Sequence, residues 1–79
     1  MIRAKVYTKD EIGHKKIELS EKEFIETFNF SLEQINYLLK NREIIISDNE
    51  IFQVLRSKDV TSSLRNIRDF LINQEKFKE

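Results

Sequence analysis

The same helix-start signal occurs twice between residues 19 and 35. In each copy, at Ser20 and at Ser31, the serine is followed three positions later by Glu or Gln. This is a capping box, in which the serine oxygen accepts an N–H of the first turn and the Glu or Gln side chain reaches back to the serine N–H. An apolar residue before each serine and another at the fourth helical position form a hydrophobic staple. The pattern predicts two consecutive helices, 21–28 and 32–40.

The segments on either side of this helix pair predict strands. Residues 2–8 and 15–19 alternate apolar and polar side chains, which is typical of half-buried strands. The polar stretch between them holds the only glycine, Gly13, which suits a turn with positive φ. We therefore expect a β-hairpin before the two helices.

A second hairpin is predicted after the helices, from strands 43–47 and 50–55. Asp48 and Asn49 favour a two-residue turn between them. This turn places Ile45 opposite Phe52, so that one face carries Ile44, Ile46, Ile51 and Leu55 and the other carries Ile45, Phe52 and Val54. Because both faces are largely apolar, each needs a covering layer or a partner.

A last helix is expected from Ser57 or Asp59 to about Gln74, with residues 75–79 frayed. Its apolar residues recur at helical spacing: Val60, Leu64, Ile67 and Leu71. The 79 residues are predicted to form a single small α+β domain, residues 1–79. The predicted order is β-β-α-α-β-β-α, with two antiparallel hairpins covered by helices.

Composition argues against catalysis. The chain has no cysteine, one histidine and one glycine, so it lacks thiolate chemistry, a metal-ligand cluster and a Gly-rich phosphate loop. We predict no enzyme activity, no catalytic or metal-binding residue, no cofactor and no small-molecule substrate. There is no apolar signal region or membrane-spanning run, which predicts a cytoplasmic protein.

The expected partner is another protein or a second copy of the chain. The predicted hairpin face and a surface aromatic supply the candidate contact residues, Tyr37, Ile45, Phe52 and Val54. A composition rich in Lys, Glu, Ile and Asn is typical of small accessory or regulatory proteins of low-GC bacteria and their phages.

The alternative partner is nucleic acid, although the fourteen basic and fourteen acidic residues balance. In element order, residues 20–56 resemble a winged helix-turn-helix. The resemblance implies that helix 32–40 enters the major groove and that hairpin 43–56 forms the wing. It implies base contacts from Gln34, Asn36 and Tyr37, and phosphate contacts from Lys40, Arg42, Arg56 and Lys58.

Overall fold

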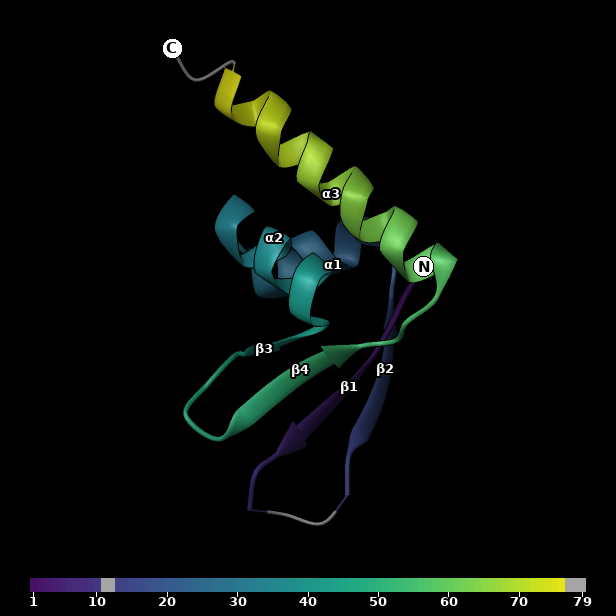
Figure 1. Ribbon diagram of the computed structural model, residues 1–79, viewed down its shortest axis with the longest axis vertical. Coiled ribbons are helices and arrows are strands. Elements are labelled where there is room, and N and C mark those ends of the chain that lie inside the picture. The colour runs from purple at the N-terminus through teal and green to yellow at the C-terminus, as the bar shows by residue number, and fades with distance from the viewer. Residues whose placement is uncertain (11–12, 77–79) are drawn as a thin grey trace.

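The computed structural model describes residues 1–10 and 13–76, with side chains of the last helix described as far as Gln74. Within these residues seven elements follow one another (Figure 1). They are β1 (Ile2–Thr8), β2 (Lys15–Leu19), α1 (Glu21–Phe28), α2 (Leu32–Asn41), β3 (Glu43–Ile45), β4 (Glu50–Val54) and α3 (Lys58–Lys76). The small α+β fold and the order β-β-α-α-β-β-α are confirmed.

Both predicted capping boxes are present. The Ser20 Oγ accepts the Glu23 N–H at 3.1 Å, and the Ser31 Oγ accepts the Gln34 N–H at 3.2 Å. The reciprocal bonds to the serine N–H groups are also made, at 3.2 and 2.8 Å. Each helix ends at a residue in the left-handed region, Asn29 with φ 50° and Arg42 with φ 66°. Local sequence therefore sets where α1 and α2 begin. Asn29 and Arg42 then end these two helices by changing the direction of the chain.

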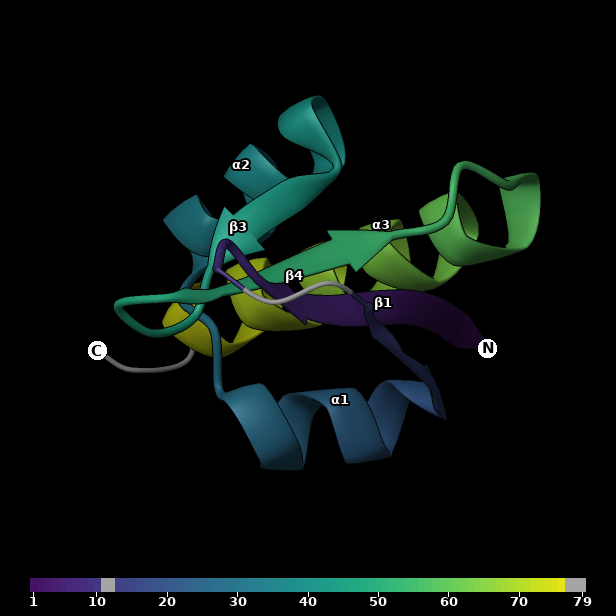
Figure 2. The ribbon, with the colours of Figure 1, turned by 90° about the horizontal axis from the view of Figure 1, so that it is seen from below.

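The four strands form one antiparallel sheet in the order β2-β1-β4-β3. The two predicted hairpins are joined by pairing of β1 with β4 at its centre. All three helices lie on the same side of this sheet, with α1 toward β2, α2 toward β3 and α3 packed on both helices and on β1 (Figures 1 and 2). The sheet therefore has one covered face and one open face.

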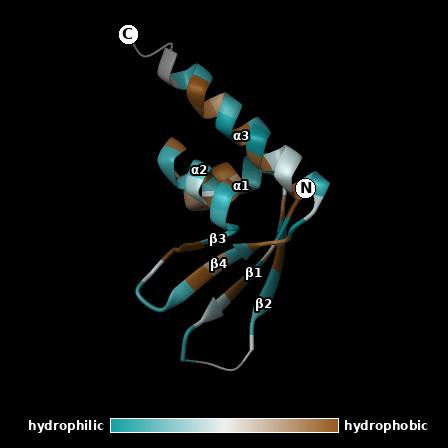
Figure 3. Ribbon diagram, viewed as in Figure 1, coloured by the Kyte–Doolittle hydropathy of each residue, from teal (hydrophilic) through white to brown (hydrophobic). Residues whose placement is uncertain are grey.

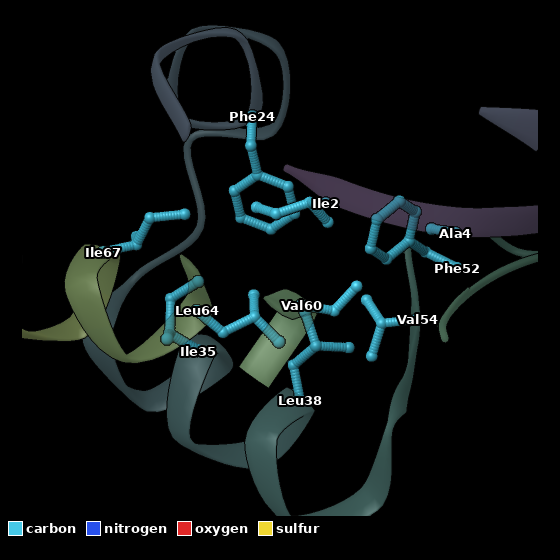
Figure 4. Packing of buried hydrophobic residues seen from close by; sticks show 10 residues of the cluster. All are labelled: Ile2, Ala4, Phe24, Ile35, Leu38, Phe52, Val54, Val60, Leu64 and Ile67. Atoms are coloured by element: carbon cyan, nitrogen blue, oxygen red, sulfur yellow. The ribbon is translucent and has the colours of Figure 1, made fainter. Parts of the chain in front are cut away.

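The hydrophobic core lies between the covered face and the helices (Figure 4). Strands contribute Ile2, Ala4, Phe52 and Val54, and the helices contribute Phe24, Ile35, Leu38, Val60, Leu64 and Ile67. Four phenylalanines also contact one another, with ring centroids 4.7–6.3 Å apart. They are Phe24 and Phe28 of α1, Phe30 of the loop after α1, and Phe52 of β4. Figure 3 shows apolar residues (brown) alternating with polar residues (teal) along the helices.

The predicted pairing of β3 with β4 is wrong by one residue. Ile45 lies opposite Ile51, and Ile44 lies opposite Phe52. The hairpin closes with the three-residue loop 47–49 rather than a two-residue turn, because the Ile46 N–H donates to the Glu50 carbonyl at 3.0 Å. Side chains alternate along a strand, so this shift places Ile44, and not Ile45, on the covered face.

The last helix is longer than predicted. It begins at Lys58, where the Ser57 Oγ accepts the Val60 N–H at 3.2 Å, and continues to Lys76. The rest of the predicted frayed end, residues 77–79, lies outside the described residues. Gly13 has the positive φ expected of it, 120°. None of the described helices is long and apolar enough to cross a membrane.

Candidate functional site

The open face is the candidate site because it carries side chains that no helix covers. The strand register arranges these side chains in three parallel rows across the sheet. The row nearest the start of α3 contains Glu18, Arg3 and Leu55; the middle row contains Lys16, Lys5, Gln53 and Glu43; the last row contains Tyr7, Ile51 and Ile45. The first two rows hold basic residues, and the last row is apolar and uncharged.

A hollow of about 580 Å³ lies where the sheet meets the start of α3. One face of α3 lines it with Lys58, Thr61, Ser62 and Arg65, which are spaced at i, i+3, i+4 and i+7. Arg42, Arg56 and Ser57 complete the lining. Among the residues described around this hollow there are four cations and three hydroxyl groups but no carboxylate, which suits an anionic ligand.

Arg42 is held in place by three hydrogen bonds. Its N–H donates to the Leu38 carbonyl at 2.8 Å, and its carbonyl accepts the Val54 N–H at 2.8 Å. Its Nη1 donates to the Thr61 Oγ1, also at 2.8 Å. The guanidinium is therefore fixed against α3 while it lines the hollow, so little side-chain entropy is lost when it contacts an anion.

Two smaller hollows extend the first one across the open face. One of about 310 Å³ shares Arg42 and Arg56 with it, and one of about 430 Å³ continues from there, sharing Lys5 and Leu55. We call the three together the basic groove. Its charged lining residues are Arg3, Lys5, Lys16, Arg42, Arg56, Lys58 and Arg65, with Glu18 and Glu43.

Charge is unevenly distributed between the basic groove and the rest of the protein. In the described part of the chain, seven basic residues but only two acidic residues line the groove, out of fourteen of each in the sequence. The remainder of the chain therefore has seven basic and twelve acidic residues. A formal net charge of zero conceals a groove with an excess of five positive charges, which attracts polyanions at short range.

Tyr7 lies across the sheet beside the groove. Its hydroxyl donates to the Glu43 Oε2 at 3.1 Å, although Tyr7 is on β1 and Glu43 is on β3, two strands away. Neighbouring strands are about 4.8 Å apart, so the phenol ring has to pass over β4 to reach Glu43. Burial raises the pKa of Tyr7 above its ordinary value of 10.0, and the hydrogen bond and charge of Glu43 raise the pKa further. The hydroxyl is therefore a stable donor at neutral pH.

The predicted protein-binding residues divide into two pairs. Tyr37 and Ile45 are 53% and 59% exposed and line one hollow of about 320 Å³ together with Glu33, Gln34 and Ile44. Phe52 and Val54 are 0% and 3% exposed. They belong to the core, because their side chains lie on the covered face beside Ala4 and Val6, and they cannot contact a partner.

The predicted nucleic-acid-binding residues are also divided. Arg42, Arg56 and Lys58 lie together in the basic groove. Gln34 lines the hollow beside Tyr37, whereas Asn36 and Lys40 are exposed on α2 and do not line the groove. The predicted wing is no free hairpin, since β4 pairs with β1 inside the sheet. The clustered cations thus adjoin the open face of the sheet rather than the exposed side of α2.

Several residues of the groove were absent from the sequence-based assignment. Thr61, Ser62 and Arg65 follow Lys58 at helical spacing, which is a signal that the sequence contained. Arg3, Lys5 and Lys16 lie on the polar sides of their strands, which the sequence also indicated. Their position beside Arg42 and Arg56 depends on the β1–β4 pairing, for which no local pattern exists.

No family model, curated protein or solved structure matches this chain. Within the described residues, no group of three His, Asp or Glu side chains is placed to hold a metal ion. The chemistry of the basic groove and of the row beside it therefore carries the functional argument.

Proposed function

We propose that this protein binds nucleic acid through the basic groove and has no catalytic activity of its own. The observation that carries the proposal is the hollow at the start of α3, where cations from the residue that follows α2, the β4–α3 connection and α3 line one space of about 580 Å³. Contacts between such cations and phosphates supply most of the affinity of non-specific nucleic-acid binding.

The arrangement also favours an extended ligand over a single small anion. The groove continues from Arg65 past Lys5 to Lys16, crossing all of β4 and β1 on the way. A single phosphate would occupy one hollow, whereas a polymer with a phosphate on every unit contacts all three. The acidic remainder of the surface restricts binding to this side of the molecule.

The test is a titration of fluorescently labelled oligonucleotides, single-stranded and duplex, by anisotropy at several salt concentrations. Replacing Arg56 and Arg65 by Ala removes two exposed groove cations. We expect the affinity to fall by about a hundredfold or more, because two charge-assisted contacts are lost and each contributes about 1.5–3 kcal/mol. The plot of log K against log salt has a negative slope, and its magnitude should fall by roughly 0.7 to 0.9 for each lost phosphate contact.

A matched control is the pair Lys22→Ala and Lys40→Ala, which removes the same charge from exposed positions on α1 and α2. We expect it to leave the slope nearly unchanged. If this pair weakens binding as much as the groove pair, the groove is the wrong surface and α2 is favoured instead. Absence of saturable binding by the wild-type protein at low salt would overturn the proposal itself.

The second candidate function is binding of another protein or self-association. It is supported by the hollow between α2 and β3, which places two exposed apolar side chains, Tyr37 and Ile45, beside each other. Aromatic anchors of this kind are enriched in protein interfaces. The cytoplasmic location expected from the sequence is compatible with both candidate functions.

A further inference from the structure

We propose that the nucleic acid is single-stranded and that its bases lie on the last row of the open face, Tyr7, Ile51 and Ile45. This inference rests on the proposed function, because it assigns the base contacts of the same ligand whose phosphates the basic groove holds. We call these three residues the apolar row.

The register of the strands places the apolar row beside the basic groove. Lys5 pairs with Gln53 and Tyr7 with Ile51, so the middle row and the apolar row are neighbours on one face. Residues two apart on a strand are about 6.6 Å apart. A strand of nucleic acid that follows the basic groove therefore has the apolar row immediately beside its phosphates, at the position where its bases project.

The apolar row contains no charged side chain, and it lies between the basic groove and the hairpin tips. Ile45 is 59% exposed, and Tyr7 and Ile51 are half-buried, so apolar surface is available to a ligand. Base stacking on aromatic side chains provides sequence-tolerant affinity in proteins that bind single strands.

The Tyr7 ring is restrained by the hydrogen bond of its hydroxyl to Glu43, two strands away across β4. A base can contact the ring without displacing this hydrogen bond, because the hydroxyl and not the ring makes it. The bond also occupies one oxygen of the Glu43 carboxylate.

A duplex fits this surface less well. Its bases are stacked within the helix, so only its phosphates would reach the protein, and the apolar row would stay in contact with water. The single strand exposes phosphates on one side and base faces on the other, which matches the two neighbouring rows.

The experiment compares Tyr7→Leu with Tyr7→Phe in binding to an eight-nucleotide oligo(dT) and to a duplex of equal length. Tyr7→Leu removes the ring, and we expect it to weaken single-strand binding by roughly 5- to 100-fold. The salt slope should not change, because no charge is lost. Tyr7→Phe keeps the ring and should stay within about threefold of wild type. Tyr37→Leu, a matched control on α2, should bind as wild type does.

A second readout does not depend on whether the Tyr7→Leu variant folds. In a Tyr37→Phe background Tyr7 is the only tyrosine, and stacking of a base on it should quench its fluorescence on addition of oligo(dT). Unquenched fluorescence, with the duplex bound as tightly as the single strand, would overturn the base assignment and leave the proposed function standing. Binding of neither ligand would overturn both.

A second copy of the chain is the competing occupant of the apolar row. If Tyr7→Leu abolished a concentration-dependent doubling of mass but left oligo(dT) affinity unchanged, the row would belong to a dimer interface and the inference would be wrong.

Discussion

At the scale of single residues, two positions show how local conformation is matched to amino-acid type. Asn29 and Arg42 both adopt positive φ at helix ends. Asn tolerates this region through its short polar side chain, whereas Arg at φ 66° carries a backbone cost of about 1–2 kcal/mol. The three hydrogen bonds of Arg42 offset this cost. A strained residue that is also bonded to Thr61 in the basic groove is consistent with a binding role for its guanidinium.

Thr8 provides a prediction at this scale. Within the described part of the chain its Oγ1 is buried and has no hydrogen-bond partner. An unpaired buried hydroxyl is costly, and Val has nearly the same shape and a higher strand preference. We expect Thr8→Val to raise the free energy of unfolding by up to about 1 kcal/mol, measured by urea denaturation.

The control is Thr27→Val, the same change at an exposed position of α1, which should alter the free energy of unfolding by less than about 0.5 kcal/mol. A loss of more than about 1 kcal/mol in Thr8→Val would mean that the Thr8 hydroxyl is bonded in solution.

At the scale of elements, the helices begin where local chemistry dictates and pack where tertiary contacts allow. The two capping boxes define the starts of α1 and α2, and Ser57 caps α3. A helix as short as the eight residues of α1 is marginal by itself in water. Burial of Phe24 against Phe52 and the neighbouring phenylalanines supplies the stability that propensity cannot.

We therefore expect the caps to contribute measurably to the stability of this small domain. Ser20→Ala and Ser31→Ala should each lower the free energy of unfolding by about 1 kcal/mol and lower Tm by about 4–8 °C. Thermal unfolding followed by circular dichroism provides the measurement. Ser20→Asp, which preserves a capping oxygen, should retain most of the stability.

Ser62→Ala serves as the matched control, because Ser62 is exposed in the interior of α3 and Ala is the better helix former. It should leave Tm unchanged or slightly higher. Equal losses in Ser62→Ala and in the two cap variants would show that the caps have no special role.

At the scale of the whole molecule, one open sheet face combines opposite kinds of surface. Basic residues from β1, β2 and α3 meet in the groove with Arg42, which precedes β3, and Arg56, which follows β4. The apolar row lies beside them. The longest dimension of the molecule is 46 Å, and the carboxyl-terminal half of α3 extends past α1 and α2 (Figure 1). The groove, at the opposite end of α3, is therefore open to a long ligand.

The second candidate function leads to a prediction at this scale. If the protein self-associates through Tyr37 and Ile45, its average mass in sedimentation equilibrium should rise above the monomer mass of 9.5 kDa as the protein concentration increases. Ile45→Lys should restore the monomer, because it places a charge in an apolar contact.

Phe70→Ala is the control, since Phe70 is a similarly exposed apolar residue on α3, at 45%. It should leave the association unchanged. A wild-type protein that stays monomeric at all concentrations would exclude self-association through this surface.

Sequence patterns predicted the helices and strands of this fold closely, because each helix or strand depends on residues that are near one another in the chain. The two capping boxes, the alternation in β1 and β2 and the spacing of Val60, Leu64 and Ile67 are all local signals. Their element order and approximate bounds appear in the structure. The register of β3 with β4 was missed because Asp48 and Asn49 favour a short turn, whereas the hydrogen bond from Ile46 to Glu50 closes a longer loop.

The candidate site was decided almost entirely by tertiary structure. From the sequence, Arg42, Arg56 and Lys58 could be recognised as basic residues near the ends of predicted elements. Only the pairing of β1 with β4 and the packing of α3 bring them beside Lys5 and Arg65. These contacts join residues far apart in the chain, and they form because the apolar sides of two hairpins and three helices share one core, so no local pattern encodes them.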